Sequence, residues 1–118
     1  LTKLAAFVAK ASGRTINPHK PITGQSIFEH ESGIHCRSLV LSPLSYQPFL
    51  PSDVGNNSVF VIGKHSGVCS IHEKLEEKGI YLTAETEKAL LYRAKQMAIS
   101  KKAALTENEF LLLINELN

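Results

Sequence analysis

The stretch at positions 28–38, FEHESGIHCRS, gathers two histidines, a cysteine and acidic side chains around Gly33. Side chains of these types bind metal ions or transfer protons. The zinc-protease signature H-E-x-x-H needs two histidines four residues apart, so that both lie on one face of a helix. Here His30 and His35 are five residues apart, which is about 140° around a helix. Ile34 occupies the position of the second ligand. The spacing therefore excludes this class of zinc site.

A second set of possible metal ligands lies further along the chain. His65, Cys69 and His72 would share one face of a helix, and Cys36 or His35 could complete a tetrahedral site. The glycines of GKHSG (63–67) favour a turn at His65 instead. Cys69 then packs as a small hydrophobic residue and His72 is solvated. We favour this second interpretation and assign no metal ligand in this chain.

The GKHSG segment itself has two possible interpretations. Two glycines before a helix, with Lys64 beside them, could present backbone N–H groups to an anion. The P-loop spacing GxxxxGK[ST] is absent. The segment is also compatible with a strand-to-helix turn in which Ser66 is the N-cap, and spacing alone favours this interpretation.

His35 is the strongest candidate for proton transfer. Histidine exchanges protons near neutral pH, and the adjacent Gly33 permits close approach of another backbone or of a ligand. Glu31 and His30 could orient the imidazole, and Tyr46 could supply a hydroxyl from across a short helix and turn. For a single histidine, a structural or solvated role is the commoner case.

The elements that must position these residues are mainly helical. Apolar periodicity and capping signals predict five helices, and one apolar β-branched run, SVFVIG at 58–63, predicts a strand. The predicted helices cover about 1–12, from 31–33 to 41, 68–78, 84–102 and 107–117. We predict a small, mainly α domain with a short two-stranded β element. It divides into a linker or lid subdomain at 1–65 and a helical subdomain at 66–118.

Composition excludes several classes of function. The chain has 118 residues, 43% hydrophobic and 20% charged, with a formal net charge of +2. Basic residues are scattered, which argues against nucleic-acid binding, and the apolar runs are too short to span a membrane. Two cysteines without a CxxC motif make a reducing, cytoplasmic location the expectation. The chain starts at Leu1 and has one methionine, Met97, so we expect a piece of a longer protein.

Three motifs in order, HESGIH, YQPFLPSDVG and VIGKHSG, with VAKASGR and KPITG upstream, resemble the region after the barrel in the homocitrate synthase and 2-isopropylmalate synthase family. The resemblance implies an acyltransferase that condenses acetyl-CoA with a 2-oxo acid and hydrolyses the thioester. It implies an absent N-terminal TIM barrel that holds a divalent metal and the 2-oxo acid, with no cofactor in this chain. This chain would be the lid over the active site of the second subunit of a homodimer.

The resemblance also implies roles for individual residues. His35 matches the histidine that reaches across the dimer to help move protons from the acetyl methyl group, and Tyr46 matches an active-site tyrosine. It implies no firm role for Lys64 or His65. By itself, the chain is expected to be inactive. We also expect exposed apolar side chains for docking, at Leu39, Val40 and Leu41 or on the last helix.

The chain departs from the family pattern beside these residues, at Cys36, Arg37, Ser38, Leu41 and Gln47, where the last replaces a usual glutamate. ASGRTINPHKPITG and HESGIHC are most similar to homocitrate synthases associated with nitrogen fixation, so 2-oxoglutarate is the favoured co-substrate. Citramalate or 2-isopropylmalate synthesis is the alternative within the class. A stand-alone metal-binding module, or a dimerisation element in which His35 is incidental, is the alternative outside it.

Overall fold

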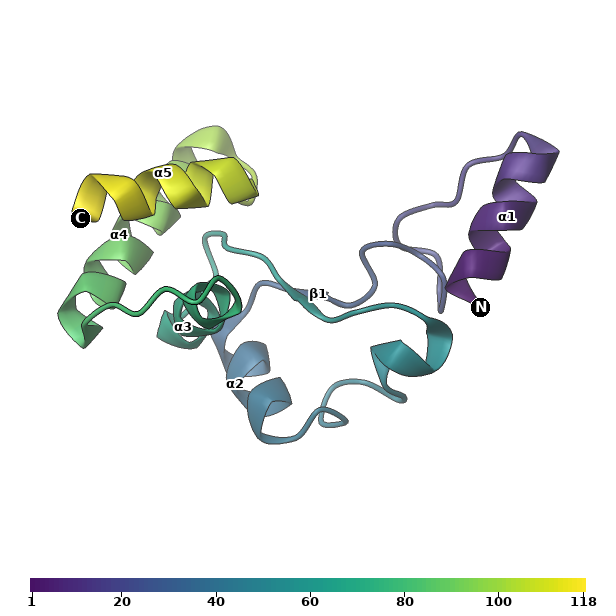
Figure 1. Cartoon of the computed structure of the whole chain (residues 1–118), viewed down its shortest axis with the longest axis horizontal. Helices are drawn as coiled ribbons and strands as arrows, with labels where there is room; N and C mark the ends of the chain where they lie inside the picture. Colours follow the sequence, from purple (N-terminus) through teal and green to yellow (C-terminus); the bar gives the residue numbers. More distant parts are fainter.

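The computed structural model of the chain describes residues 1–118 and contains five α-helices, one 3-10 helix and two short strands. This confirms the predicted mainly α fold with a two-stranded β element. The chain forms an open U (Figure 1), with principal extents of 48 × 30 × 24 Å. Along the chain the elements are α1 (Thr2–Ser12), β1 (Glu29–His30), α2 (Gly33–Leu41), η1 (Pro51–Val54), β2 (Val59–Phe60), α3 (Val68–Glu77), α4 (Ala84–Lys101) and α5 (Glu107–Leu117).

Local signals in the sequence set the helix ends. Helix α1 ends at Gly13, which adopts the left-handed conformation with φ 68° that glycine accommodates without steric cost. Helix α4 begins after Thr83, whose side chain accepts the N–H of Thr86. Helix α5 begins with a complete capping box, in which Thr106 and Glu109 each satisfy the other's backbone N–H. These contacts confirm the predicted starts and stops.

The two strands form a minimal parallel sheet. Glu29 is paired with Val59, and His30 is paired with Phe60. The predicted strand at 58–63 therefore contributes only two residues to a ladder. No third strand is present to extend the pairing, and the chain turns at 63–66. The role of this short ladder is to hold the start of the HESGIH motif beside the segment that leads into GKHSG.

The hydrophobic core lies among α3, α4 and α5. Ile62, just after β2, completes it, and its carbonyl accepts the N–H of Leu105 at 2.8 Å, which ties the strand segment to the start of α5. Burial of this apolar surface is the main contribution to the stability of the helical part. The core residues are Ile62, Ile71, Leu75, Leu90, Ala94, Phe110, Leu113 and Ile114.

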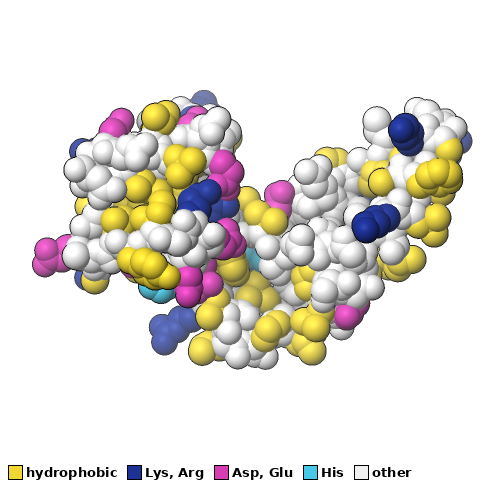
Figure 2. All heavy atoms as spheres, viewed as in Figure 1, with side chains coloured by type: hydrophobic (Ala, Val, Ile, Leu, Met, Phe, Trp, Pro, Cys, Tyr) yellow, Lys and Arg dark blue, Asp and Glu magenta, His cyan; other side chains and the backbone are white.

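Helix α1, at the N-terminal arm of the U, differs from the helices of the core because it buries no residue. The Thr2 hydroxyl donates to the Val54 carbonyl at 2.7 Å and anchors the arm to η1. The apolar stripe of α1 lies on the surface, with Leu1, Leu4, Phe7 and Val8 each more than half exposed. Figure 2 shows hydrophobic side chains on the surface of both arms and a hollow between them. None of the helices is long and apolar enough to cross a lipid bilayer.

Candidate active site

The HESGIH and GKHSG motifs interlock through their glycines. Gly33 begins α2 and lies directly against Gly67, which precedes α3. A Cβ atom on Gly33 would lie 2.7 Å from the Gly67 Cα atom. The Gly33 N–H donates to the His65 carbonyl at 3.3 Å. The sequence predicted that Gly33 admits either a backbone or a ligand, and the structure places a backbone there. This contact fixes where α2 starts relative to α3.

Glu31 supports the same junction from the side. Its Oε1 atom accepts the backbone N–H of His65 at 2.9 Å. The carboxylate lies against Gly63, where an added Cβ would come within 2.4 Å of the same oxygen. Glu31 was expected to orient the imidazole of His35, but its carboxylate hydrogen-bonds to the backbone of the GKHSG loop instead. Glu31 therefore helps to hold the GKHSG loop against the HESGIH segment.

Ser66 also has a different role from the predicted N-cap. Gly67 is the N-cap of α3, and no side chain caps this helix. The Ser66 hydroxyl is buried and accepts the Gly63 N–H at 2.9 Å. It lies 3.2 Å from the Glu31 carbonyl oxygen, to which it can donate. The serine closes the loop internally, because its backbone lies one residue too early to reach the first turn of α3.

His35 and Tyr46 form an aromatic pair on the surface. His35 is the third residue of α2, and its ring centroid lies 4.4 Å from that of Tyr46, with 47° between the ring planes. His35 is exposed, and Tyr46 is 52% exposed. The structure thus brings together the two residues that the sequence analysis selected, 11 positions apart in the chain. An imidazole and a phenol in this arrangement can both reach a molecule that approaches from outside.

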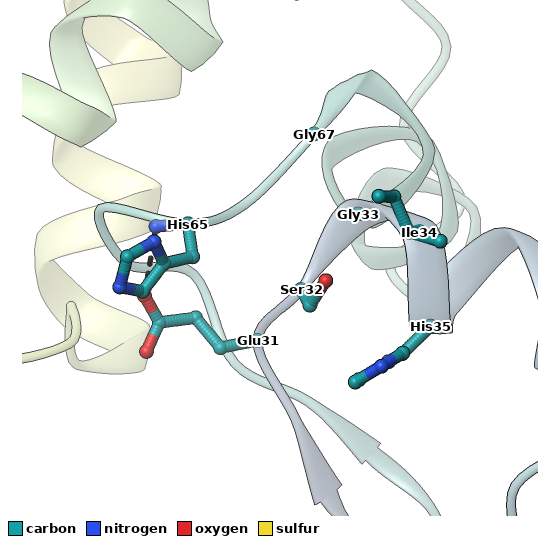
Figure 3. A pocket seen from close by; sticks show the side chains of 7 residues that line it. All are labelled: Glu31, Ser32, Gly33, Ile34, His35, His65 and Gly67. Atoms are coloured by element: carbon teal, nitrogen blue, oxygen red, sulfur yellow. Dashed lines mark hydrogen bonds between the residues drawn. The ribbon is translucent and has the colours of Figure 1, made fainter.

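An open depression lies beside this pair. Figure 3 shows the His35 ring projecting from α2, whereas the His65 ring lies beside the Glu31 carboxylate on the other side of Ser32. Only one of the residues that line the depression is hydrophobic, and the others are glycines or residues with polar or ionisable side chains. Its lining residues are Glu31, Ser32, Gly33, Ile34, His35, His65 and Gly67. A second surface is needed to enclose a substrate here.

The exposed apolar residues around His35 differ in part from the prediction. Leu39 is 6% exposed and belongs to the interior, because it lies on the face of α2 that turns away from solvent. Val40 and Leu41 are exposed as expected, and Ile34 next to His35 is 74% exposed. On the last helix, Leu112 is exposed as well. Apolar side chains therefore border the candidate site on α2.

His30 lies in a partly buried environment behind the site. Its Nε2 atom is 3.0 Å from the Nε2 atom of Gln47, and the Gln47 amide also donates to the Ser58 hydroxyl at 3.2 Å. Burial lowers the pKa of His30, and the positive charge of His35 lowers it further. The neutral ring can accept the amide N–H. Gln47, one of the departures from the family pattern, thus contacts a histidine of the HESGIH motif, which the sequence analysis did not foresee.

The alternative metal site is not assembled. No group of three or more histidine, cysteine, aspartate or glutamate side chains is arranged to hold a metal ion. The Sγ atom of Cys69 lies 3.1 Å from that of Cys36, whereas His72 Nδ1 lies 3.0 Å from a Glu87 carboxylate oxygen. His65 lies before α3 and does not share the helical face of Cys69 and His72, so the spacing of these three residues does not bring their side chains together.

Comparison with known proteins places these motifs in context. A family model described as "homocitrate synthase post-HMGL domain-like" matches residues 22–102. Homocitrate synthase 1 of Nostoc sp. is 42% identical, over 98% of this chain and 31% of that protein. 2-Isopropylmalate synthase 2 of Caldanaerobacter subterraneus subsp. tengcongensis is 40% identical, over 97% of this chain and 30% of that protein. 2-Phosphonomethylmalate synthase of Streptomyces rubellomurinus is 34% identical, over 98% and 31%. The chain spans about a third of the length of these relatives.

Proposed function

Since this chain belongs to the homocitrate synthase post-HMGL domain-like family, we propose that it is the lid region of an acyltransferase. The proposed enzyme condenses acetyl-CoA with a 2-oxo acid and then hydrolyses the thioester. The observation that carries the proposal is the exposed His35 ring against Tyr46, on a helix whose first residue, Gly33, packs directly against Gly67. A ring buried among the lid's own side chains could not serve another domain.

In the proposed reaction the lid supplies proton transfer. Removal of a proton from the acetyl methyl group needs a base that is positioned near the methyl carbon. His35 takes part in this transfer together with a carboxylate of the barrel, and Tyr46, whose ring lies against the His35 ring, donates a hydrogen bond from its hydroxyl. The divalent metal expected from the resemblance is assigned to the barrel. The side chains of this chain form no ligand set for it, and no step of the lid passes through it.

The proposed partners are the enzyme's own N-terminal barrel and the second subunit of a homodimer. The open depression beside His35 is incomplete as a binding site by itself. The exposed Ile34, Val40 and Leu41 on the helix that carries His35 supply apolar surface for docking. Enclosure between lid and barrel would exclude water from the reacting groups.

The favoured 2-oxo acid is 2-oxoglutarate. This choice rests on the 42% identity to a protein named homocitrate synthase 1 and on the HESGIHC and ASGRTINPHKPITG segments. A 2-isopropylmalate synthase is 40% identical over a similar span, so identity in this region discriminates weakly between acids. We assign the choice of acid to the barrel, and a role in nitrogen fixation follows only if the acid is 2-oxoglutarate.

A chimera tests the proposal. Residues 1–118 replace the matching C-terminal third of the Nostoc enzyme, and release of the CoA thiol from acetyl-CoA is measured with 2-oxoglutarate, 2-oxoisovalerate or pyruvate. We expect activity that His35→Ala lowers about 100-fold or more in kcat, with unchanged binding of the 2-oxo acid. Tyr46→Phe should have a smaller effect. The matched control is His19→Ala, because His19 is an exposed loop histidine remote in sequence. Full activity of the His35→Ala chimera would overturn the role of His35.

A further inference from the structure

The two cysteines of the chain lie side by side although they belong to different helices. Cys36 is in α2 and Cys69 is in α3, and their Sγ atoms are 3.1 Å apart. Both are free thiols. The proposed proton-transfer chemistry uses neither of them.

The glycine contact explains why the thiols meet. Cys36 follows Gly33 by three residues and Cys69 follows Gly67 by two, so each thiol lies in the first turn of a helix that starts at the backbone contact. Because glycines allow the two chains to approach without intervening Cβ atoms, the next side chains on the facing sides come within reach of each other. The contact between Gly33 and Gly67 that joins the two motifs therefore also brings the two thiols together.

We propose that Cys36 and Cys69 form a redox pair, which closes to an intramolecular disulfide on exposure to a small disulfide such as oxidised glutathione. In the first step the Cys69 thiolate attacks one sulfur of the reagent, and one glutathione thiolate leaves. In the second step Cys36 loses its proton and attacks the Cys69 sulfur, and the second glutathione thiolate leaves. Two protein thiols are oxidised and one small disulfide is reduced to two thiols, because the two protons lost by the cysteines are taken up by the two departing glutathione thiolates.

The order of the steps follows from burial. Cys69 is partly exposed, whereas Cys36 is fully buried, so the reagent reaches Cys69 first. Burial, reinforced by the hydrogen bond to Cys69, raises the pKa of Cys36 to about 12. Cys36 therefore stays protonated until it acts as the resolving thiol. Its small thiolate fraction is offset by the fixed proximity of its target and by the higher nucleophilicity of a more basic thiolate.

The disulfide would join α2 to α3 at a single point next to His35. It would close a loop between positions 33 residues apart in the chain, which restricts the unfolded chain and stabilises the fold. Reversible closure under oxidising conditions is the pattern of redox-sensing rather than structural disulfides in a reducing compartment. The proposal rests on the geometry of the thiols and holds whether or not the chain supports the acyltransfer reaction.

The experiment treats the reduced 118-residue chain with a series of reduced and oxidised glutathione mixtures at pH 7.5. We expect the intact mass to fall by the mass of two hydrogen atoms, with no glutathione attached to the protein. The thiol titre after denaturation should fall from two to zero. Peptide mapping should find the Cys36–Cys69 link, and dithiothreitol should restore both thiols. The oxidised chain should also unfold at a temperature higher by on the order of 10 °C.

Two variants separate the steps. Cys36→Ala should keep one glutathione on Cys69, because no resolving thiol remains, and Cys69→Ala should resist modification, because Cys36 is buried. Circular dichroism establishes that each variant is folded. If a variant fails to fold, the mass and the peptide map of the wild-type chain still show whether the Cys36–Cys69 disulfide forms. Persistent free thiols, a stable glutathione adduct on wild-type Cys69, or only intermolecular disulfides would each overturn the proposal.

Discussion

Gly33 and Gly67 meet backbone to backbone, and a Cβ atom placed on Gly33 would lie 2.7 Å from the Gly67 Cα atom and 2.8 Å from its nitrogen. The two glycines belong to the two motifs that the sequence singled out, and their contact sets the start of the helix that carries His35. The junction is therefore where sequence motif, packing and proposed function coincide.

The direction in which Gly33→Ala changes the free energy of unfolding tests this contact. Gly33 does not adopt a left-handed conformation, and alanine is preferred over glycine in helices, so helix propensity alone predicts stabilisation. The clash with backbone atoms, which cannot move aside cheaply, predicts destabilisation instead. We expect Gly33→Ala to lower the free energy of unfolding by about 1–3 kcal/mol in urea denaturation. Ser32→Ala is the matched control, because Ser32 makes no capping hydrogen bond. A more stable Gly33→Ala chain would contradict the contact.

Removal of the Glu31 carboxylate should loosen the GKHSG loop. Oε1 of Glu31 accepts the His65 N–H at 2.9 Å, and a hydrogen bond to a charged group contributes about 1.5–3 kcal/mol. Glu31→Ala should therefore speed amide hydrogen exchange at His65 by about tenfold or more. Glu29→Ala is the control, because Glu29 is exposed and its carboxylate forms no hydrogen bond or ion pair. Equal exchange rates in both variants would show that the Glu31 carboxylate does not stabilise the GKHSG loop.

Replacement of Gln47 by glutamate, the residue usual in the resembling family, should raise the pKa of His30. Burial and then the charge of His35 lower this pKa in the wild-type chain. Protonation is thus disfavoured in the folded state, and stability is lost as the pH falls from 6.5 through the folded pKa. A carboxylate at the position of the amide would favour the protonated ring and reverse this trend.

NMR titration of the His30 ring protons measures the effect of Gln47→Glu. Ser58→Ala is the matched control, since it removes the other partner of Gln47 without adding charge. A higher titration midpoint in Gln47→Glu, and little change in Ser58→Ala, is the expected result. An unchanged midpoint in Gln47→Glu would mean that residue 47 does not control the charge of His30.

The His72–Glu87 pair should make stability depend on pH in the opposite direction. The hydrogen bond that the His72 ring donates to the Glu87 carboxylate, and then the negative charge of Glu87, raise the pKa of His72. The stabilisation is fully present below the unfolded pKa near 6.5 and is lost as the pH rises through the folded pKa. It amounts to at most about 1 kcal/mol, because the His72 side chain is 58% exposed.

Urea denaturation at pH 5.5 and pH 8.5 tests this pair. His72→Gln should lower the free energy of unfolding at pH 5.5 and have little effect at pH 8.5. His19→Gln, at an exposed histidine that forms no ion pair, serves as the control. A loss that is larger at pH 8.5 would contradict the assigned sign.

Much of the local structure was predictable from the sequence. The left-handed Gly13, the N-cap Thr83 and the capping box of Thr106 and Glu109 define helix ends by interactions within four residues. His35 and Tyr46 were selected by side-chain chemistry and by resemblance, and only one short helix and turn separate them. Such signals are readable because the partners are close in the chain.

Only the tertiary structure decided which distant residues meet. The contacts of Gly33 with Gly67, Glu31 with His65, and Cys36 with Cys69 each join positions more than 30 residues apart. The Ser66 side chain hydrogen-bonds within its own loop. The residues of the disfavoured metal-site interpretation lie in two separate pairs, Cys36 with Cys69 and His72 with Glu87. Helical periodicity carries no information on these pairings, because they depend on how α2 and α3 pack. Residue types and local spacing determined the helices and the candidate imidazole, and the packing of two glycines determined what surrounds it.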